Sequence, residues 1–444
     1  MTTITRRGML AGSAAGTAAA LLPAVPASAA PLAPTPPMGW NSWNSFATTI
    51  NEAQARETAR IMAATLLPAG YDVFTVDIQW YEPAASSYTY NAHPTPAMDG
   101  YGRLIPAPNR FPSSAGGKGF APLAAAVHGM GLKFGIHLMR GIPRLAVERN
   151  LPVLGTRYRA ADIADTASIC PWNPDMYGVA MSRPGAQAYY DSVFRLYADW
   201  GVDFVKMDDM SRPYDAHAPE IEAAHKAIGA TGRPIILSLS PGETPVIRGD
   251  HVRRFAQMWR ISDDFWDEWP LLEAQFTRLE NWIAWRSVGA WPDADMLPLG
   301  RLALGQRDTK FTPDEQRTLM TLWSIARSPL IMGGDLRHLD APTLALLTNR
   351  EVIAVNQRSA DNRPHFVADG TRIWSARPEG AGGRYVALFN TTSAALTVGL
   401  PLRDLGLEGT QQVRDLWSGK SLGSASGRFE QRIPSHGAGL YRLG

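Results

Sequence analysis

Short apolar runs alternate with amphipathic stretches along most of this chain. β-Branched and aromatic residues fill runs bounded by glycine or polar residues, and four of the clearest are 71–77, 133–137, 204–208 and 234–239. Runs of this length and composition are typical of buried strands. Between them, apolar residues spaced three and four apart predict helices, among them Asn51–Leu67, Ala186–Trp200 and Pro313–Ala326. Thr312 and Glu315 form a capping-box pattern at the start of the last of these helices.

This alternation of strand and helix repeats about eight times before residue 357, which predicts an α/β fold of the (β/α)8 TIM-barrel type. An open, doubly wound sheet is the alternative. It would need a glycine-rich phosphate loop after an early strand, and the sequence contains none. The segment Leu138–Arg183 is longer than an ordinary barrel loop, so we expect it to form a pocket wall or a lid.

The pattern changes after Gln357. Short alternating segments separated by Gly, Asn and Ser turns predict an antiparallel β-sandwich over residues 358–444. The expected strands are 372–376, 385–389, 395–400, 412–415, 427–433 and 439–442. The catalytic barrel is then expected to span residues 30–357.

The first 29 residues predict a twin-arginine export signal. Arg6 and Arg7 precede a small-residue apolar run, and Ala27-Ser28-Ala29 is a cleavage pattern. Pro23 and Pro26 interrupt the run, which disfavours a membrane anchor. We therefore expect the mature protein to be secreted, periplasmic or on the cell surface.

Composition narrows the choice of partner. Hydrophobic residues make up 45% and charged residues 19% of the chain, and the formal charge is only +2. This balance gives no reason to expect binding to nucleic acid. Apart from the signal, no stretch of the sequence is long and apolar enough to span a bilayer, so we expect no membrane partner. Cys170 is the single cysteine, so no intrachain disulfide can form, and no histidine placement suggests a base for it as a nucleophile.

Acidic residues stand at the ends of several predicted strands. Asp208 and Asp209 end the run WGVDFVKMDD, and Asp77, Asp264 and Asp295 occupy similar places. Active sites of TIM barrels lie at these carboxyl ends, and glycosidases need two carboxyl groups on either side of one bond. The competing interpretation is that these acids only form ion pairs or hold a structural cation. No pair of histidines at ligand spacing supports a metal site, and we expect neither metal nor cofactor.

Seven stretches together resemble glycoside hydrolase family 27, the retaining α-galactosidase family. They are PPMGWNSWNSF at 36–46, GLKFGI at 131–136, DWGVDFVKMD at 199–208, WRISDD at 259–264, WPDADML at 291–297, SPLIMGGDL at 328–336 and VRDLWSG at 413–419.

The resemblance implies that Asp208 is the nucleophile and Asp264 the general acid/base of a double displacement. Lys206 lies two residues before Asp208, and on a strand both point to the same face. The charge of Lys206 would then keep Asp208 ionised. Asp209 and Asp263 are the adjacent competitors, and alternation sends both to the opposite side.

The resemblance also implies a set of sugar contacts. Trp43 is expected under the sugar ring and Asp295 near its 2-hydroxyl, while the remaining hydroxyl contacts are Asp77, Lys206 and Arg260.

Four departures from the family pattern concern the sugar rather than the catalytic pair. Ile78 replaces the second acid of a sugar-binding pair, and Ser240 stands where α-galactosidases carry a glutamate. Met210 replaces a cysteine, and the loop after the third strand carries the Leu138–Arg183 insertion. The expected protein is a secreted retaining α-galactosidase-type hydrolase acting on a carbohydrate.

Several alternatives remain open at this stage. The same chemistry on α-N-acetylgalactosaminides, on β-L-arabinopyranosides or in isomaltose release from dextran is the first alternative. A non-catalytic carbohydrate-binding protein and a metal-dependent hydrolase are weaker ones. The sequence leaves the oligomeric state open.

Overall fold

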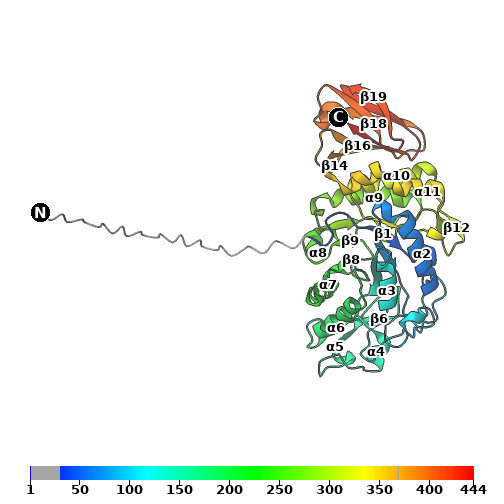
Figure 1. Cartoon of the computed structure of the whole chain (residues 1–444), viewed down its shortest axis with the longest axis vertical. Coiled ribbons are helices and arrows are strands. Elements are labelled where there is room, and N and C mark those ends of the chain that lie inside the picture. Colours follow the sequence, from blue (N-terminus) through cyan, green and yellow to red (C-terminus); the bar gives the residue numbers. More distant parts are fainter. Residues whose placement is uncertain (2–30, 369) are drawn as a thin grey trace. The chain divides into compact units, whose positions relative to one another are not determined.

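Eight parallel strands form the central sheet (Figure 1). The structure is a computed structural model that describes Met1 and residues 31–368 and 370–444, so the predicted signal peptide lies outside the described residues apart from Met1. The strands are β1 Met38–Asn41, β2 Val73–Val76, β3 Lys133–Met139, β7 Phe204–Asp208, β8 Ile236–Leu239, β9 Met258–Arg260, β10 Trp291–Asp293 and β13 Leu330–Met332.

These strands pair in chain order, and the last returns to the first. β13 pairs with β1 in parallel, with Met38 opposite Leu330. A further parallel bridge joins Leu297, just after β10, to Met332 of β13. The predicted TIM barrel is therefore confirmed, with all strand carboxyl ends at one mouth.

Helices connect the strands, and their local sequence explains where they begin and end. They are α2 Glu52–Thr65, α3 Ala121–His128, α6 Ala186–Asp199, α7 Tyr214–Thr231, α8 Gly249–Phe255, α9 Trp269–Asn281, α10 Pro313–Ala326, α11 Ala341–Thr348 and α12 Arg350–Gln357. The predicted capping box of α10 is confirmed. The backbone N–H of Glu315 donates to Thr312 Oγ1 over 3.3 Å, and that of Thr312 donates to Glu315 Oε2 over 2.9 Å.

The long segment after β3 has structure of its own. It contains a three-stranded antiparallel sheet in the order β4-β6-β5, made of β4 Ile142–Pro143, β6 Met176–Val179 and β5 Ala164–Ile169. The short helices α4 Arg144–Glu148 and α5 Ala160–Ile163 lie between these strands. Gly141 begins this excursion with a φ of +95°, and a Cβ there would lie 1.9 Å from the carbonyl oxygen of Tyr177, so only glycine fits.

The C-terminal part is antiparallel, as predicted. One sheet has the order β14-β15-β16-β21-β18-β19 and the other pairs β17 with β20. The strands are β14 Ser359–Ala368, β15 Thr371–Pro378, β16 Arg384–Asn390, β17 Leu396–Pro401, β18 Thr410–Asp415, β19 Lys420–Ser426, β20 Arg428–Ile433 and β21 Ala438–Leu443. The six predicted strands are present, and β14 and β19 were not predicted.

The larger C-terminal sheet shares a hydrophobic core with the barrel. Trp374, Phe389 and Leu440 belong to the same buried cluster as the barrel helices. Phe389 of β16 meets Phe276 of α9 with ring centroids 4.9 Å apart. Residues 32–444 form one compact unit, and the boundary at residue 357 between two domains stays a prediction. No helix in the described part of the chain is long and apolar enough to cross a membrane.

Candidate active site

Asp208 lies at the carboxyl end of β7, where the barrel mouth opens. Asp208 is only 8% exposed to solvent. Its Oδ2 lies 3.0 Å from Nε2 of His137, which comes from the neighbouring strand β3. The backbone N–H of Asp209 donates to its Oδ1 over 2.9 Å. Both carboxyl oxygens therefore accept hydrogen bonds, an arrangement that favours the ionised form.

The surroundings of Asp208 lower its pKa. Burial alone would raise the pKa, because a low-dielectric interior disfavours charge. The hydrogen bond from His137 and the nearby charge of Lys206 outweigh burial and lower the pKa of Asp208 to about 2. Because the carboxylate can only accept, Nε2 of His137 carries the proton. At neutral pH Asp208 is a buried, oriented carboxylate.

Lys206 makes its closest contact with Asp77, whereas its spacing along the strand suggested Asp208. Its Nζ lies 3.0 Å from Oδ2 of Asp77, at the end of β2. Asn41 of β1 donates to the same oxygen over 2.6 Å. Burial alone would raise the pKa of Asp77. The charge of Lys206 is the largest cause acting the other way, and the net effect is a lowered pKa.

Arg260, at the end of β9, links two further predicted residues. One guanidinium nitrogen lies 2.8 Å from Oδ1 of Asp295, and the other lies 3.3 Å from Oδ1 of Asp264. Arg260 and Asp295 are buried, whereas the side chain of Asp264 is 56% exposed. The two predicted catalytic acids thus differ sharply in environment, with Asp208 enclosed and Asp264 open to incoming molecules.

One small cavity of about 20 Å³ lies inside the barrel, where it also touches Phe204 and Met258 at the starts of β7 and β9. Four of the predicted residues line it, namely Lys206, Ser240, Arg260 and Asp295. Ser240 Oγ and Arg260 Nε are buried and find no hydrogen-bond partner within the described residues. Buried polar atoms of this kind are costly unless a ligand or solvent pairs with them. A cavity of this size has room for one water molecule, which is the partner that suits these two atoms.

Trp43 and Ile78 lie in contrasting positions. Trp43 follows β1, is half-buried, and its ring stacks nearly parallel to that of Tyr90, 6.3 Å away and inclined by 9°. Ile78 follows Asp77 directly and is buried in the main hydrophobic core, with an exposure of 1%. Ile78 offers no polar side-chain atom next to Asp77.

The adjacent acids Asp209 and Asp263 have other partners. Asp209 is buried, and its Oδ2 lies 2.8 Å from a guanidinium nitrogen of Arg140. Asp263 is exposed and pairs with Arg212 on the surface over 2.5 Å. The expectation that alternation sends both to the opposite side does not apply to Asp263, because β9 ends at Arg260 and strand alternation stops there.

Two residues of this region were missed from the sequence. His137 ends the predicted strand at 133–137, and only the pairing of β3 with β7 reveals that it faces Asp208. Asp293 ends β10 and lines the same small cavity as Arg260. Burial raises the pKa of Asp293 to about 7, although Arg260 acts in the opposite direction. An acid at a strand end was an available signal for Asp293, as it was for Asp295.

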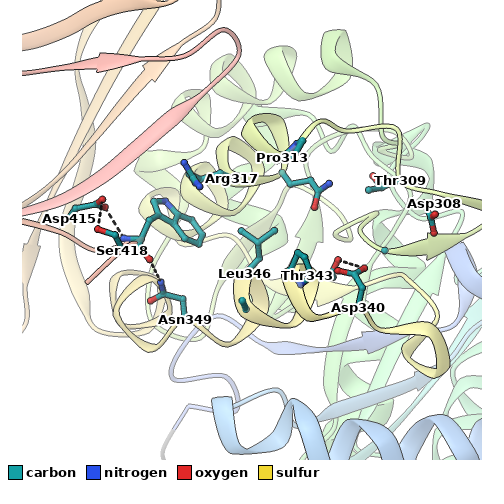
Figure 2. Close-up of a pocket in the computed structure, with 15 residues that line it drawn as sticks. Asp308, Thr309, Pro313, Arg317, Asp340, Thr343, Leu346, Asn349, Asp415 and Ser418 are labelled. Carbon is teal, nitrogen blue, oxygen red and sulfur yellow. Dashed lines mark hydrogen bonds between the residues drawn. The ribbon is translucent and has the colours of Figure 1, made fainter. Parts of the chain in front are cut away.

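A roomier cavity, of about 670 Å³, lies away from these strand ends, between α10, α11 and the turn after β18 (Figure 2). Two of its carboxylates and one of its amides form hydrogen bonds within the protein. Asp415 accepts from Ser418 over 2.7 Å, and Asp340 accepts from the Thr343 hydroxyl over 2.8 Å. Asn349 donates to the carbonyl oxygen of Leu416 over 3.0 Å. These groups cap helices and fix a turn, so this cavity is not the candidate active site.

The arrangement at the barrel mouth suits displacement at an acetal carbon. A buried carboxylate that is ionised at neutral pH can attack, and an exposed carboxyl group can exchange a proton with a departing oxygen or a water molecule. Neighbouring acids, a lysine and an arginine can bind hydroxyl groups.

Comparisons with known proteins agree with this chemistry. Residues 171–358 match the family model described as alpha galactosidase A, and residues 368–443 match that of the alpha galactosidase C-terminal beta sandwich domain. Alpha-galactosidase 3 of Arabidopsis thaliana is 30% identical over 413 residues, which cover 90% of this chain and 79% of the relative. Alpha-galactosidase of Cyamopsis tetragonoloba is 30% identical, with 90% and 83% covered.

A solved structure is more similar still. It is the GH27 β-L-arabinopyranosidase of Geobacillus stearothermophilus, which is 48% identical and has a TM-score of 0.91, with 93% of this chain and 97% of that chain covered. The fold, both sequence comparisons and the acids at the barrel mouth lead to one conclusion: this chain is a glycoside hydrolase and belongs to glycoside hydrolase family 27.

Proposed function

We propose that this protein removes β-L-arabinopyranosyl residues from glycosides by a double displacement that retains anomeric configuration. Asp208 attacks the anomeric carbon, the glycosidic bond breaks, and Asp264 gives its proton to the departing oxygen. Water then attacks the resulting ester while Asp264 takes a proton from it, which frees the sugar and Asp208. The observation that carries this chemistry is the buried carboxylate of Asp208 at the barrel mouth, which accepts from Nε2 of His137 over 3.0 Å and from the backbone N–H of Asp209 over 2.9 Å.

The choice of sugar rests on Ile78. β-L-Arabinopyranose has the ring configuration of α-D-galactopyranose but lacks the hydroxymethyl group. A site built for that group needs a polar partner, whereas Ile78 places buried apolar bulk beside Asp77. The 48% identity to the arabinopyranosidase of Geobacillus stearothermophilus supports the same choice.

α-Galactosidase activity is the second candidate. Asp77, Lys206 and Arg260 would bind the hydroxyl groups that both sugars share, and the plant relatives are α-galactosidases. A pocket that rejects only one extra hydroxymethyl group discriminates by about 10 to 200-fold. We therefore expect measurable but slower turnover of α-galactosides.

A panel of nitrophenyl glycosides tests both candidates. It contains the β-L-arabinopyranoside, the α-galactoside and the α-N-acetylgalactosaminide, with dextran as a polymeric substrate. NMR of the first product anomer reports stereochemistry in the same experiment. Fastest turnover of the arabinopyranoside, with the β anomer of the free sugar appearing first, supports the proposal. Faster turnover of another glycone, or first appearance of the inverted anomer, contradicts it.

Replacing the nucleophile tests the mechanism. Asp208→Asn should lower kcat/KM by at least about 10³-fold on every substrate, because no covalent intermediate can form. Asp263→Asn is the matched control, because Asp263 is an acid of the loop after β9 that lies on the surface. The control should keep nearly full activity. An Asp208→Asn variant that folds and cleaves these substrates at the wild-type rate would refute the assignment of Asp208 as the nucleophile.

Two variants of Ile78 separate bulk from polarity. Ile78→Ala removes bulk without adding a polar group, whereas Ile78→Asp adds a carboxylate beside Asp77. We expect the ratio of α-galactoside to β-L-arabinopyranoside turnover to rise in Ile78→Ala if bulk excludes the hydroxymethyl group. A rise only in Ile78→Asp would identify the missing hydrogen-bond partner as the cause. An unchanged ratio in both variants would show that Ile78 does not select the sugar.

We also propose export through the twin-arginine pathway, on the evidence of Arg6-Arg7 and the Ala27-Ser28-Ala29 cleavage pattern. Mass spectrometry of protein recovered outside the cytoplasm should find Ala30 at the N-terminus. Replacing both arginines with lysine should retain the protein inside. Export of that variant at the normal rate would contradict this route.

A further inference from the structure

Exposed and buried residues alternate along the loop that carries Asp264. Phe265 and Asp267 are buried, whereas Asp264 is exposed and Trp266 is half-buried. Asp264 and Trp266 therefore lie on the solvent side of the loop, and Phe265 and Asp267 lie on the side that packs against the protein.

Both inward residues are firmly held. The backbone N–H of Phe265 donates to Asp295 Oδ2 over 2.7 Å, and its ring packs 5.2 Å from Trp323. Asp267 accepts from both terminal nitrogens of Arg307, with the longer contact at 2.8 Å, and from the backbone N–H of Lys310 over 2.6 Å. A bidentate arginine–carboxylate pair is geometrically restrictive. The backbone is therefore held on both sides of Trp266.

Aromatic rings connect Trp266 to the expected sugar position. The ring of Trp266 lies 6.1 Å from that of Tyr88, inclined by 68°. Tyr88 in turn lies 5.5 Å from Trp43, inclined by 86°. The Tyr88 hydroxyl donates to the carbonyl oxygen of Asn44 over 2.9 Å, which holds this ring in place. The three rings contact one another edge to face in the order Trp266, Tyr88 and Trp43, and we call this row the Trp266 wall.

The position of this wall relative to the two carboxyl groups matters. In the proposed mechanism Asp264 protonates the departing oxygen, so the leaving group lies on the Asp264 side of the glycone. Trp266 is two residues from Asp264 on the same exposed side of one loop. Trp43, at the other end of the wall, is expected under the glycone itself.

From these contacts we infer that Trp266, supported by Tyr88, is the binding platform for the leaving group, and that this group is a sugar whose apolar ring face stacks on the indole. The inference rests on the proposed double displacement and adds the second sugar of the substrate to it. Aromatic residues offer large rigid apolar surfaces to such faces at a low entropic cost. Trp266 acts in binding and specificity, and Asp264 alone transfers the proton.

Three substrates with one glycone test this inference by kcat/KM, which reports the first bond cleavage. A disaccharide has a bulky leaving group that needs protonation. A 2,4-dinitrophenyl glycoside has a bulky leaving group that does not. A glycosyl fluoride has a small leaving group and needs no protonation by Asp264.

The inference predicts that Trp266→Ala lowers kcat/KM by about tenfold on the disaccharide and on the dinitrophenyl glycoside, and leaves the fluoride nearly unchanged. Trp266→Phe should restore most of the loss. Asp264→Ala is the comparison, because loss of the acid should affect the disaccharide alone. Tyr101→Ala, which removes an exposed aromatic residue elsewhere in the loop after β2, should leave all three substrates unaffected.

Each other outcome has a distinct meaning. If Trp266→Ala loses activity only on the disaccharide, Trp266 acts through the acid and the platform is refuted. Equal loss on all three substrates, or no loss on any, also refutes it. Failure of the wild-type protein to cleave any of the three, with either glycone, would instead refute the proposed function.

Discussion

The charge of Asp208 depends on one neighbouring side chain more than on any other. Burial would raise the pKa of this carboxyl group, and the hydrogen bond from His137 is the largest of the causes that lower it. In the proposed mechanism the same bond orients the attacking oxygen. We therefore expect His137 to act as a positioning residue for Asp208, and its effect should be visible in the pH dependence.

Replacing His137 with phenylalanine should raise the pKa of Asp208. A hydrogen bond to a charged group contributes about 1.5–3 kcal/mol, which corresponds to roughly one to two pH units. Because the proposed mechanism needs the unprotonated form of Asp208, the acidic limb of the kcat/KM profile should move to higher pH. His137→Gln keeps a donor and should move the limb less. An unmoved limb in His137→Phe would contradict this role.

Asp293 should make folding stability depend on pH. Burial raises its pKa to about 7 in the folded protein, against about 3.9 in an unfolded chain. Well below pH 4 the carboxyl group is protonated in both the folded and the unfolded state, so its ionisation does not change the free energy of unfolding. Between pH 4 and 7 the unfolded chain ionises first, so stability falls by up to about 4 kcal/mol and stays lowered above pH 7.

Asp293→Asn tests this dependence. Asparagine keeps an acceptor for the backbone N–H of Asp295, which donates to Asp293 over 3.0 Å, and it cannot ionise. The variant should have a higher melting temperature than the wild type at pH 8, and the difference should vanish near pH 4. Parallel curves for the two proteins over this range would contradict the prediction.

The sequence predicts Asp77 and Asp208 at the ends of strands, because each follows an apolar run. Asp264 was expected at a strand end as well, but it lies in the loop four residues after β9 ends at Arg260. The neighbours of these acids are harder to predict. His137 matters only because β3 lies beside β7. The preference of Lys206 for Asp77 over Asp208 depends on where side chains end across the barrel, which spacing along one strand does not fix.

At the scale of elements, Arg140 connects the barrel to the insertion. It follows β3, and its guanidinium pairs with Asp209 after β7 over 2.8 Å and with Glu220 of α7 over 2.6 Å. Glu220 also accepts from the backbone N–H of Val179 in β6 over 3.2 Å. One buried cation thus joins two barrel strands, a helix and the added sheet.

Arg140→Met should destabilise the protein by about 3–5 kcal/mol, because it leaves two buried carboxylates without a counter-charge. Denaturant unfolding measures this loss. The double variant Arg140→Met with Glu220→Gln removes one of the uncompensated charges and should recover part of it. A single variant as stable as the wild type would show that Arg140 does not hold these elements together.

Elements with a regular hydrophobic period are predicted from the sequence, and edge elements are not. β14 and β19 lie at the two edges of the larger C-terminal sheet. β14 contains Pro364 and two register shifts, and β19, KSLGSAS, is almost wholly exposed. Neither shows apolar alternation. α7 is a harder case for the opposite reason: it runs from Tyr214 to Thr231 and contains Pro219, a residue that in a sequence usually marks a helix boundary.

At the scale of the whole molecule, the barrel and the larger C-terminal sheet are packed together. His436, before β21, stacks on Trp269 of α9 with ring centroids 3.8 Å apart and an inclination of 2°. The hydroxyl of Thr318 in α10 donates to the carbonyl oxygen of His436 over 2.6 Å. With Phe276 and Phe389 these contacts continue one core across the junction.

We therefore expect one thermal transition in which activity and sandwich structure are lost together. Phe389→Ala removes a fully buried ring at the junction and should lower that single midpoint, since such a loss costs about 3–5 kcal/mol. Phe429→Ala, in the separate core of the sandwich, should shift the same transition. Calorimetry that resolves two transitions, with Phe429→Ala moving only one, would contradict a shared core.

The pairing of β1 with β13 has a consequence for how this protein is made. Met38 needs Leu330 as its partner, so the first strand synthesised has an open edge until nearly three hundred further residues have left the ribosome. Contacts this distant in sequence form slowly, and an unpaired edge attracts other chains. The barrel of this enzyme therefore cannot close until β13 has been synthesised. We expect aggregation of unfinished chains to limit the yield when many are made at once.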